Sequence, residues 1–138
     1  MGGTRLKITV DTNVLVRAAV VDNKVQAAQA VKILQDADLI AVPLPVLCEY
    51  VWVLLRGYEI PVADIAASIY QLKNTENVVM NDTAVEAGLD VLEAGGDFAD
   101  GVIAYEGEFL GADTLLSFDK KAVSILQSLG KSAFLPGA

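Results

Sequence analysis

Two aspartates follow predicted strands and could therefore take part in chemistry at the edge of a sheet. Asp11 and Asp119 each come directly after a short run of residues that is typical of a β-strand. In open α/β sheets, ligands bind at the carboxyl ends of the strands, so both carboxylates are candidates for a site there. Asp is also a favoured N-cap, and each residue could instead simply begin the helix that follows it.

A glutamate stands in the middle of an apolar segment. Glu49 lies within V-L-C-E-Y-V-W-V-L-L, where most of its neighbours are hydrophobic. A lone carboxylate is costly to bury unless it is paired or protonated, so we expect Glu49 to face a polar cleft. The alternative is that it lies on the solvent-exposed edge of an amphipathic helix.

A third acidic motif opens a predicted helix. Asp97 and Asp100 are three residues apart and follow the break at Gly95-Gly96. That spacing places both on one helical face near the N-terminus, where the helix dipole favours negative charge. The pair could share a cation, or it could be an N-cap followed by a first-turn acid.

The composition narrows the chemistry that these acids could do. The sequence has no histidine and one cysteine, so imidazole metal sites and nucleophilic systems that need histidine are absent. It also lacks the usual glycine-rich phosphate-binding loops. Carboxylates alone favour hard cations such as Mg²⁺ or Mn²⁺, and with them metal-assisted phosphodiester hydrolysis. The residues by themselves do not indicate whether the substrate is RNA or another phosphate ester.

Length, charge and hydropathy set the broad class. With 138 residues, 54% of them hydrophobic, we expect a single domain over residues 1–138. The lone Cys48 suits a reducing compartment, and no segment reads as a signal peptide or membrane span, so a cytoplasmic protein is expected. The net charge of −8 argues against tight, non-specific duplex binding.

Short β-branched runs alternate with helix-length stretches, which predicts an α/β domain with a parallel sheet. We expect strands at Leu6–Val10, Leu39–Val42, Asn77–Met80, Leu115–Phe118 and Ala133–Leu135. We expect helices at about Asn13–Val20, Val25–Asp36, Val46–Arg56, Pro61–Lys73, Thr83–Glu93, Phe98–Phe109 and Lys120–Leu129. Thr83 and Glu86 match a capping box for the fifth of these helices.

Four segments together resemble the ordered acidic motifs of PIN domains, in particular those of VapC-type toxins. They are K-I-T-V-D-T-N-V-L-V-R (Lys7–Arg17), L-C-E-Y-V-W-V-L-L (Leu47–Leu55), D-F-A-D-G-V-I-A (Asp97–Ala104) and L-L-S-F-D-K-K-A (Leu115–Ala122). The resemblance extends over nearly the whole chain. It implies a three-layer α/β/α sandwich with a mainly parallel sheet of about five strands. It also implies a Mg²⁺- or Mn²⁺-dependent endoribonuclease that leaves 5′-phosphate and 3′-hydroxyl ends.

The same resemblance assigns roles to individual residues. Asp11, Asp100 and Asp119 would hold metal directly or through water, with Asp97 as an auxiliary acid. Glu49 would orient a metal-bound water or complete a second cation site. The polar residues that fall beside these carboxylates are Thr12, Asn13 and Ser117. Gly101 departs from the family pattern, which more often has alanine there.

The resemblance also implies partners. VapC-type toxins act on RNA, form homodimers, and are held by an antitoxin whose chain end lies in an apolar groove. Tyr50, Trp52, Tyr58 and the segment Leu44–Leu55 could supply such a groove, although ordinary core is the simpler interpretation for most of them. The candidates for phosphate contacts are Arg17, Lys24, Arg56, Lys120 and Lys121, each of which could equally be a solvated surface charge.

Three other functions fit the sequence less well. A non-catalytic PIN-like module that binds a protein partner would not need all four acidic positions. A phosphoryl-accepting receiver domain wants adjacent acids after the first strand, whereas Asp11 follows Val10 alone. A haloacid dehalogenase-like phosphatase needs D-x-D, which D-T-N-V lacks.

Overall fold

The chain divides into two compact units, Met1–Asn81 and Asp82–Ala138. The computed structural model describes residues 6–137, so Met1–Arg5 and Ala138 lie outside the described residues. A single domain over residues 1–138 stays a prediction. Among the residues described, no helix is long and apolar enough to cross a membrane.

A parallel sheet of three strands organises the first unit. The strands β1 (Lys7–Thr9), β2 (Leu39–Ala41) and β3 (Val78–Val79) lie in the order β1-β2-β3. Ile40, at the centre of the sheet, is paired with Ile8 on one side and Val78 on the other. Two further backbone hydrogen bonds, from Val10 to Ala41 (3.2 Å) and from Val42 to Val79 (2.9 Å), continue the pairing toward the carboxyl ends.

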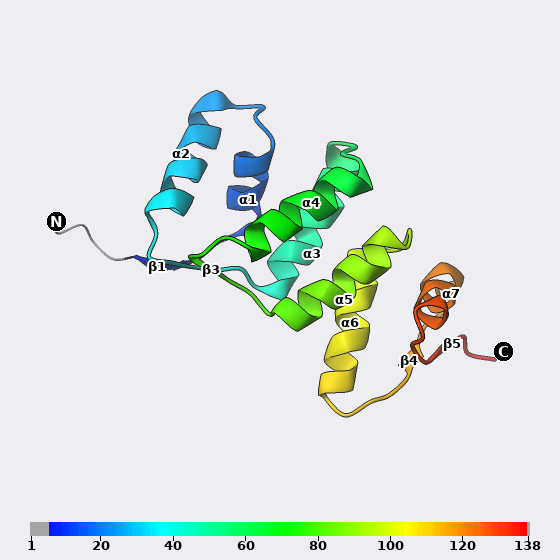
Figure 1. The fold of residues 1–138 in the computed structure, drawn as a ribbon. Coiled ribbons are helices and arrows are strands. Elements are labelled where there is room, and N and C mark those ends of the chain that lie inside the picture. The colour runs from blue at the N-terminus through cyan, green and yellow to red at the C-terminus, as the bar shows by residue number, and fades with distance from the viewer. Residues whose placement is uncertain (1–5, 138) are drawn as a thin grey trace. The chain divides into compact units, whose positions relative to one another are not determined.

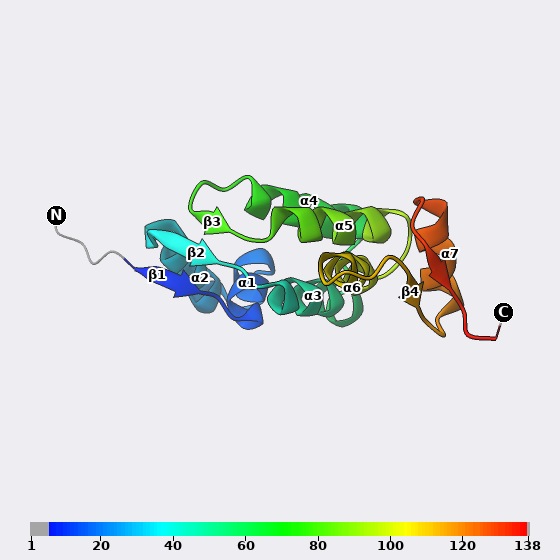
Figure 2. The same cartoon turned by 90° about the horizontal axis from the view of Figure 1, so that it is seen from below.

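Four helices complete this unit: α1 (Thr12–Ala19), α2 (Lys24–Asp36), α3 (Leu44–Trp52) and α4 (Val62–Lys73). The ribbon views show α1, α2 and α4 on the same side of the three strands (Figures 1 and 2). A π-helical turn, η1 (Val53–Gly57), extends α3. The buried side chains of α3 and η1 follow helical spacing and form the core together with α4: Leu47, Tyr50, Val51, Leu54, Ile65 and Ile69.

The second unit is built on a close crossing of α5 (Asp82–Glu93) and α6 (Phe98–Phe109). After α6 come β4 (Leu115–Leu116), α7 (Lys120–Ser128) and β5 (Ala133–Phe134), and the two strands are parallel. One buried apolar cluster joins α5, α7 and β5 through Val91, Val123, Leu126 and Ala133. This cluster holds α7 against the two strands, so the start of α7 is fixed relative to the end of β4.

The predicted α/β class with parallel strands is confirmed, and every predicted helix and strand is present in the described residues. The predicted number of about five strands is also correct, but the strands form a three-stranded and a two-stranded sheet, one in each unit. The predicted start of α5 is wrong by one residue. The helix begins at Asp82, so Thr83 lies inside the first turn and is not the N-cap.

Candidate functional site

Asp11 is exposed at the carboxyl end of β1, where it caps α1. Its Oδ1 accepts a hydrogen bond from the backbone N–H of Thr12 at 2.7 Å, which makes it the N-cap of the helix. Its other carboxylate oxygen accepts no hydrogen bond from residues 6–137. The structural interpretation of Asp11 as a cap is therefore correct, and it leaves Oδ2 available for a ligand.

The side-chain hydroxyl of Thr12, next to this carboxylate, is buried without a hydrogen-bond partner among the described residues. Only 5% of the surface of Thr12 is exposed. Buried hydroxyls are nearly always satisfied, so such an atom is normally paired with water or a ligand. The neighbouring Asn13 is exposed.

Glu49 lies on the exposed side of α3, which agrees with the alternative that it occupies the solvent-exposed edge of an amphipathic helix. The hydrophobic neighbours Leu47, Tyr50 and Val51 are buried on the opposite side of the helix. The carboxylate therefore stays solvated, and it is free of the desolvation cost that a buried acid would carry. An exposed glutamate can accept a proton or orient a water, but it needs no partner to be stable.

Asp97 caps α6 just after the break between the two crossing helices. Gly95 has φ of +97°, a left-handed conformation that favours glycine, and the N–H of Gly96 donates to the carbonyl of Val91 at 2.8 Å. This ends α5 and turns the chain so that Oδ1 of Asp97 accepts from the N–H of Ala99 at 3.1 Å. The predicted glycine break thus positions the third acidic motif.

Asp100 is half-buried in the first turn of α6. Its pKa is raised above the ordinary value, first by burial and then by the negative charges of Asp97 and Asp119. The structure therefore brings these three carboxylates, from the starts of two helices, into one electrostatic environment within the second unit. The negative charges of Asp97 and Asp119 make ionisation of Asp100 less favourable, and a bound cation would reverse that effect.

Asp119 is fixed at the end of β4 by hydrogen bonds on both sides. Its Oδ1 accepts from the N–H of Ala122 at 3.1 Å and caps α7, while its own N–H donates to Oγ of Ser117 at 3.0 Å. The N–H of Ser117 in turn donates to the carbonyl of Phe134 at 3.2 Å. Ser117 thereby links the position of Asp119 to the two-stranded sheet.

The donor chemistry of these acids fits a hard divalent cation, but the structure does not place a complete set of ligands. Three of the carboxylates use Oδ1 for capping, which leaves Oδ2 for other ligands. Within residues 6–137, no group of three or more acidic or cysteine side chains is close enough to hold a metal ion. Asp11 and Glu49 belong to the first unit, and Asp97, Asp100 and Asp119 to the second.

Gly101 has a structural role that was not recognised from the sequence. A Cβ at this position would lie 2.3 Å from the carbonyl oxygen of Ala87, so only glycine lets α5 and α6 approach this closely. At Gly88, across the crossing, a Cβ would meet the ring of Phe98 at 2.7 Å. Two glycines in consecutive predicted helices are the signal that could have indicated a close crossing beside Asp100.

Of the three aromatic residues proposed for a partner groove, Tyr50 is buried and the other two reach the surface. Tyr50 is 2% exposed and its hydroxyl donates to Ser68 at 2.9 Å, whereas Trp52 is 59% exposed. Tyr58 is half-buried and donates to Asp22. The core interpretation is thus correct for Tyr50.

The comparisons with known proteins identify the family. The PIN domain family model matches residues 8–125, a span that covers most of the chain and includes all five acidic positions. The chain therefore belongs to the PIN domain family. PIN domains are generally nucleases that use divalent metal ions. No curated protein matches the chain.

Proposed function

We propose that this PIN domain is a metal-dependent endoribonuclease of the VapC type, in which Asp11, Glu49, Asp100 and Asp119 are the catalytic acids. The observation that carries the proposal is the placement of Asp97, Asp100 and Asp119, from two separate motifs, near one another: burial raises the pKa of Asp100, and the charges of Asp97 and Asp119 raise it further. Acids that repel each other are retained at a cost in stability, and binding of a cation offsets that cost.

The positions of the acids support the same proposal. Asp97 and Asp100 lie at the start of α6 and Asp119 at the start of α7. Capping holds Asp11, Asp97 and Asp119 in fixed conformations. Carboxylates held in fixed conformations are the ligands that a hard cation prefers.

In the proposed site, Asp11, Asp97, Asp100 and Asp119 would hold Mg²⁺ or Mn²⁺. Such a cation, when bound, neutralises charge on a phosphodiester and makes a water more acidic. Glu49, which is exposed and not required for capping, would orient the attacking water. Ser117 would hold Asp119 in place through its hydrogen bond, and the unpaired hydroxyl of Thr12 would complete the polar surroundings of Asp11.

Basic side chains beside the acids would contact the substrate backbone. Lys120 and Lys121 directly follow Asp119, are exposed, and form no salt bridge with any described residue. With a net charge of −8, the chain would rely on the cation and on a few such lysines to bind RNA. This favours single-stranded substrates that are bound weakly and turned over.

The proposed biological setting follows from the resemblance to VapC-type toxins. A cytoplasmic homodimer with a cognate antitoxin is the state in which such a nuclease would be kept inactive. The four ordered motifs, which span Lys7 to Ala122, are the support for this part of the proposal.

The experiment is cleavage of a mixed RNA pool by the purified chain with Mg²⁺, with Mn²⁺ and with EDTA. We expect cleavage that depends on metal and that falls at least about 100-fold in Asp100→Asn. The control is Asp90→Asn, which removes the same charge from an exposed position of α5. A folded protein that cleaves no RNA with either metal would instead favour the non-catalytic, partner-binding alternative.

A further inference from the structure

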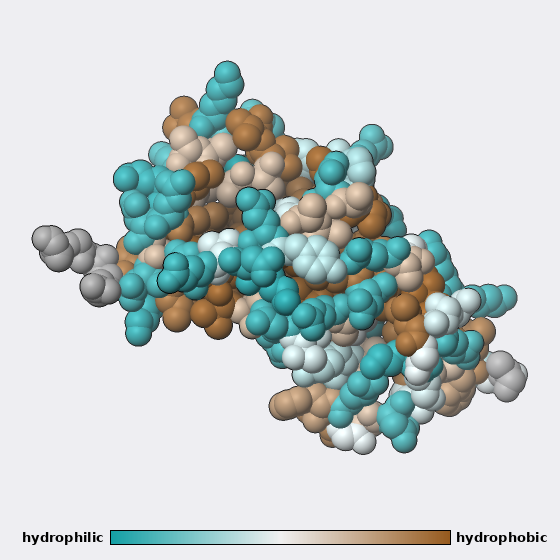
Figure 3. Space-filling view, in the orientation of Figure 1, coloured by the Kyte–Doolittle hydropathy of each residue, from teal (hydrophilic) through white to brown (hydrophobic). Residues whose placement is uncertain are grey.

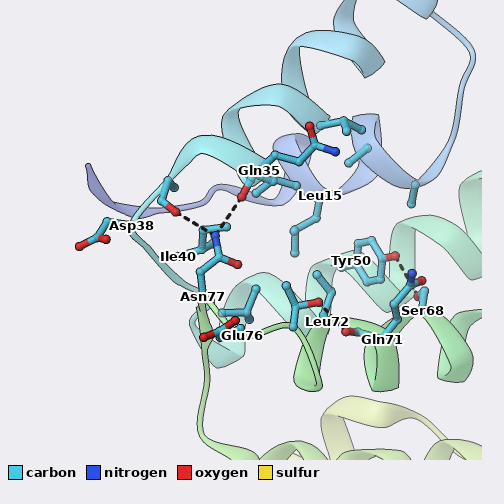
Figure 4. Close-up of a pocket in the computed structure, with 17 residues that line it drawn as sticks. Leu15, Gln35, Asp38, Ile40, Tyr50, Ser68, Gln71, Leu72, Glu76 and Asn77 are labelled. Carbon is cyan, nitrogen blue, oxygen red and sulfur yellow. Dashed lines mark hydrogen bonds between the residues drawn. The ribbon is translucent and has the colours of Figure 1, made fainter. Parts of the chain in front are cut away.

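A large cleft in the first unit lies between α2 and α4 and is also lined by residues of α1, α3, β2 and β3. Its volume is about 930 Å³, and all of its lining residues belong to the first unit. Hydrophobic side chains line the hollow between these two helices (Figure 3). The close-up shows Leu15, Ile40 and Leu72 pointing into it (Figure 4). The cleft is open to solvent, is lined by both aliphatic and polar side chains, and has the size that small ligands occupy.

One end of the cleft is built from hydrogen-bond acceptors. The side-chain amide of Asn77 donates from Nδ2 to the carbonyls of Leu34 (3.0 Å) and Ala37 (2.9 Å) at the end of α2 (Figure 4). Both protons of that amide are therefore used, so the remaining atom, Oδ1, can only accept a hydrogen bond. The two bonds also hold the half-buried Asn77 in one orientation.

The charged side chains that line this end of the cleft are both acidic. Asp38 and Glu76 are the only charged residues among those that line the cleft, and both precede strands that are neighbours in the sheet. Glu76 forms no ion pair with any residue that the structure describes. A ligand with an anionic group would be repelled here, whereas a cationic hydrogen-bond donor would be attracted.

The opposite end offers a different environment. There the hydroxyl of Tyr50 donates to Ser68, which donates to the carbonyl of Ile65 at 2.7 Å, so both protons are already used. Between the two ends the floor and walls are mainly aliphatic. The cleft therefore has a polar, acidic end and an apolar body.

We propose that this cleft binds a small amphipathic cation, with its apolar body over Leu15, Ile40 and Leu72 and its ammonium or guanidinium group beside Asp38, Glu76 and Asn77. Burial of the apolar body supplies affinity, and the acceptors at one end fix the orientation and exclude anions. The site uses none of the acids proposed for RNA cleavage, so the proposal stands independently of that activity.

The test is a titration of the ¹⁵N-labelled full chain with two isosteric probes, 4-phenylbutylammonium and 4-phenylbutyrate. Binding is measured from the changes in the chemical shifts of the backbone amides. We expect the ammonium probe to bind in the millimolar range and to shift the amides of Leu34, Ala37, Ile40 and Leu72. It should bind about three- to tenfold more tightly than the carboxylate probe, as expected for attraction by exposed carboxylates. High salt should reduce the preference.

Matched variants separate this site from general attraction to an acidic protein. Glu76→Gln should remove most of the preference for the ammonium probe, while Glu59→Gln, with the same change in charge outside the cleft, should leave it intact. Ala19→Phe should block both probes, because it places a ring from an exposed position of α1 into the cleft. Equal affinity for the two probes, equal effects of the two Glu→Gln changes, or shifts confined to other regions would overturn the proposal.

Discussion

The hydroxyl of Ser117 accepts a hydrogen bond from the backbone N–H of Asp119 at 3.0 Å, and so joins the end of β4 to the acid that begins α7. The N–H of Ser117 is bonded to Phe134 in the neighbouring strand, so the position of Asp119 is set by the sheet as well as by its helix. In the proposed site this is the link between the fold and one of the catalytic carboxylates.

Removing the Ser117 hydroxyl should loosen Asp119 without unfolding the protein. We expect Ser117→Ala to lower RNA cleavage about three- to tenfold and to cost about 0.5–1.5 kcal/mol in the free energy of unfolding, the usual value of one hydrogen bond. Ser117→Thr, which keeps the hydroxyl, should restore most of the activity. Cleavage rates and urea denaturation measure the two effects, and equal activity in all three proteins would show that the bond has no role in positioning.

Two substitutions of Asp119 separate its role as a helix N-cap from its proposed role in catalysis. Asn is as good an N-cap as Asp, so Asp119→Asn should keep the free energy of unfolding within about 0.5 kcal/mol while abolishing cleavage. Asp119→Ala removes the cap as well and should cost about 1 kcal/mol more. Thermal unfolding and cleavage assays on the pair provide the test. If Asp119→Asn cleaves RNA normally, Asp119 is a cap and nothing else.

The crossing of α5 and α6 depends on a glycine. A Cβ on Gly101 would lie 2.3 Å from the carbonyl oxygen of Ala87 and 2.8 Å from Cα of Gly88, and backbone atoms cannot rotate away. Gly101→Ala should therefore destabilise the protein by about 1–3 kcal/mol, as overpacking does.

The matched control lies on the same helix. A Cβ on Gly107 would have no atom within 4 Å, so Gly107→Ala should stabilise the protein by about 0.5–1 kcal/mol through helix propensity alone. Urea denaturation compares the two variants. Changes of the same sign would mean that the close approach at Gly101 does not limit the side chain.

The raised pKa of Asp100 predicts a dependence of stability on pH. Its pKa is raised in the folded state above the ordinary value of 3.8, mainly by burial and then by Asp97 and Asp119. Between those two values the folded state binds more protons than the unfolded state, so stability falls as the pH rises through that window. The destabilisation is complete above the folded pKa.

Asp100→Asn should consequently be more stable than the natural sequence at pH 7 without divalent ions, by up to about 1 kcal/mol because the group is partly exposed. The advantage should disappear below pH 3.8, where Asp100 is neutral in both states. Added Mg²⁺ or Mn²⁺ should stabilise the natural sequence more than the variant. Urea denaturation at several pH values, with Asp90→Asn as control, measures these differences in stability. An Asp100→Asn protein that is less stable than the natural sequence at pH 7 would contradict the prediction.

Much of the fold could be predicted because it depends on local signals. The start of α6 at Phe98 follows from the glycine break and the capping acid before it. The strands were placed by their β-branched runs. Thr83 was misjudged because Asp82 can join the helix one residue earlier, a choice that the T-x-x-E pattern does not resolve.

What could not be predicted depends on contacts between distant segments. The spacing around Glu49 suggested apolar neighbours on most sides, yet only the folded helix shows which side is buried. The division of the strands into two sheets and the close crossing at Gly101 also depend on pairings across the chain. The cleft is lined by residues of four helices and two strands, and no single motif marks it.

The proposed activity requires a divalent cation bound by carboxylates from separate motifs, and Mn²⁺ binding tests this requirement most directly. Electron paramagnetic resonance of free Mn²⁺ would be followed while the purified chain and its Asp11→Asn, Asp100→Asn, Asp119→Asn and Asp90→Asn variants are added. We expect the natural sequence and Asp90→Asn to bind Mn²⁺ alike, and each of the other three to bind at least about tenfold more weakly. Equal binding by all five folded proteins, or binding by none, would contradict the account.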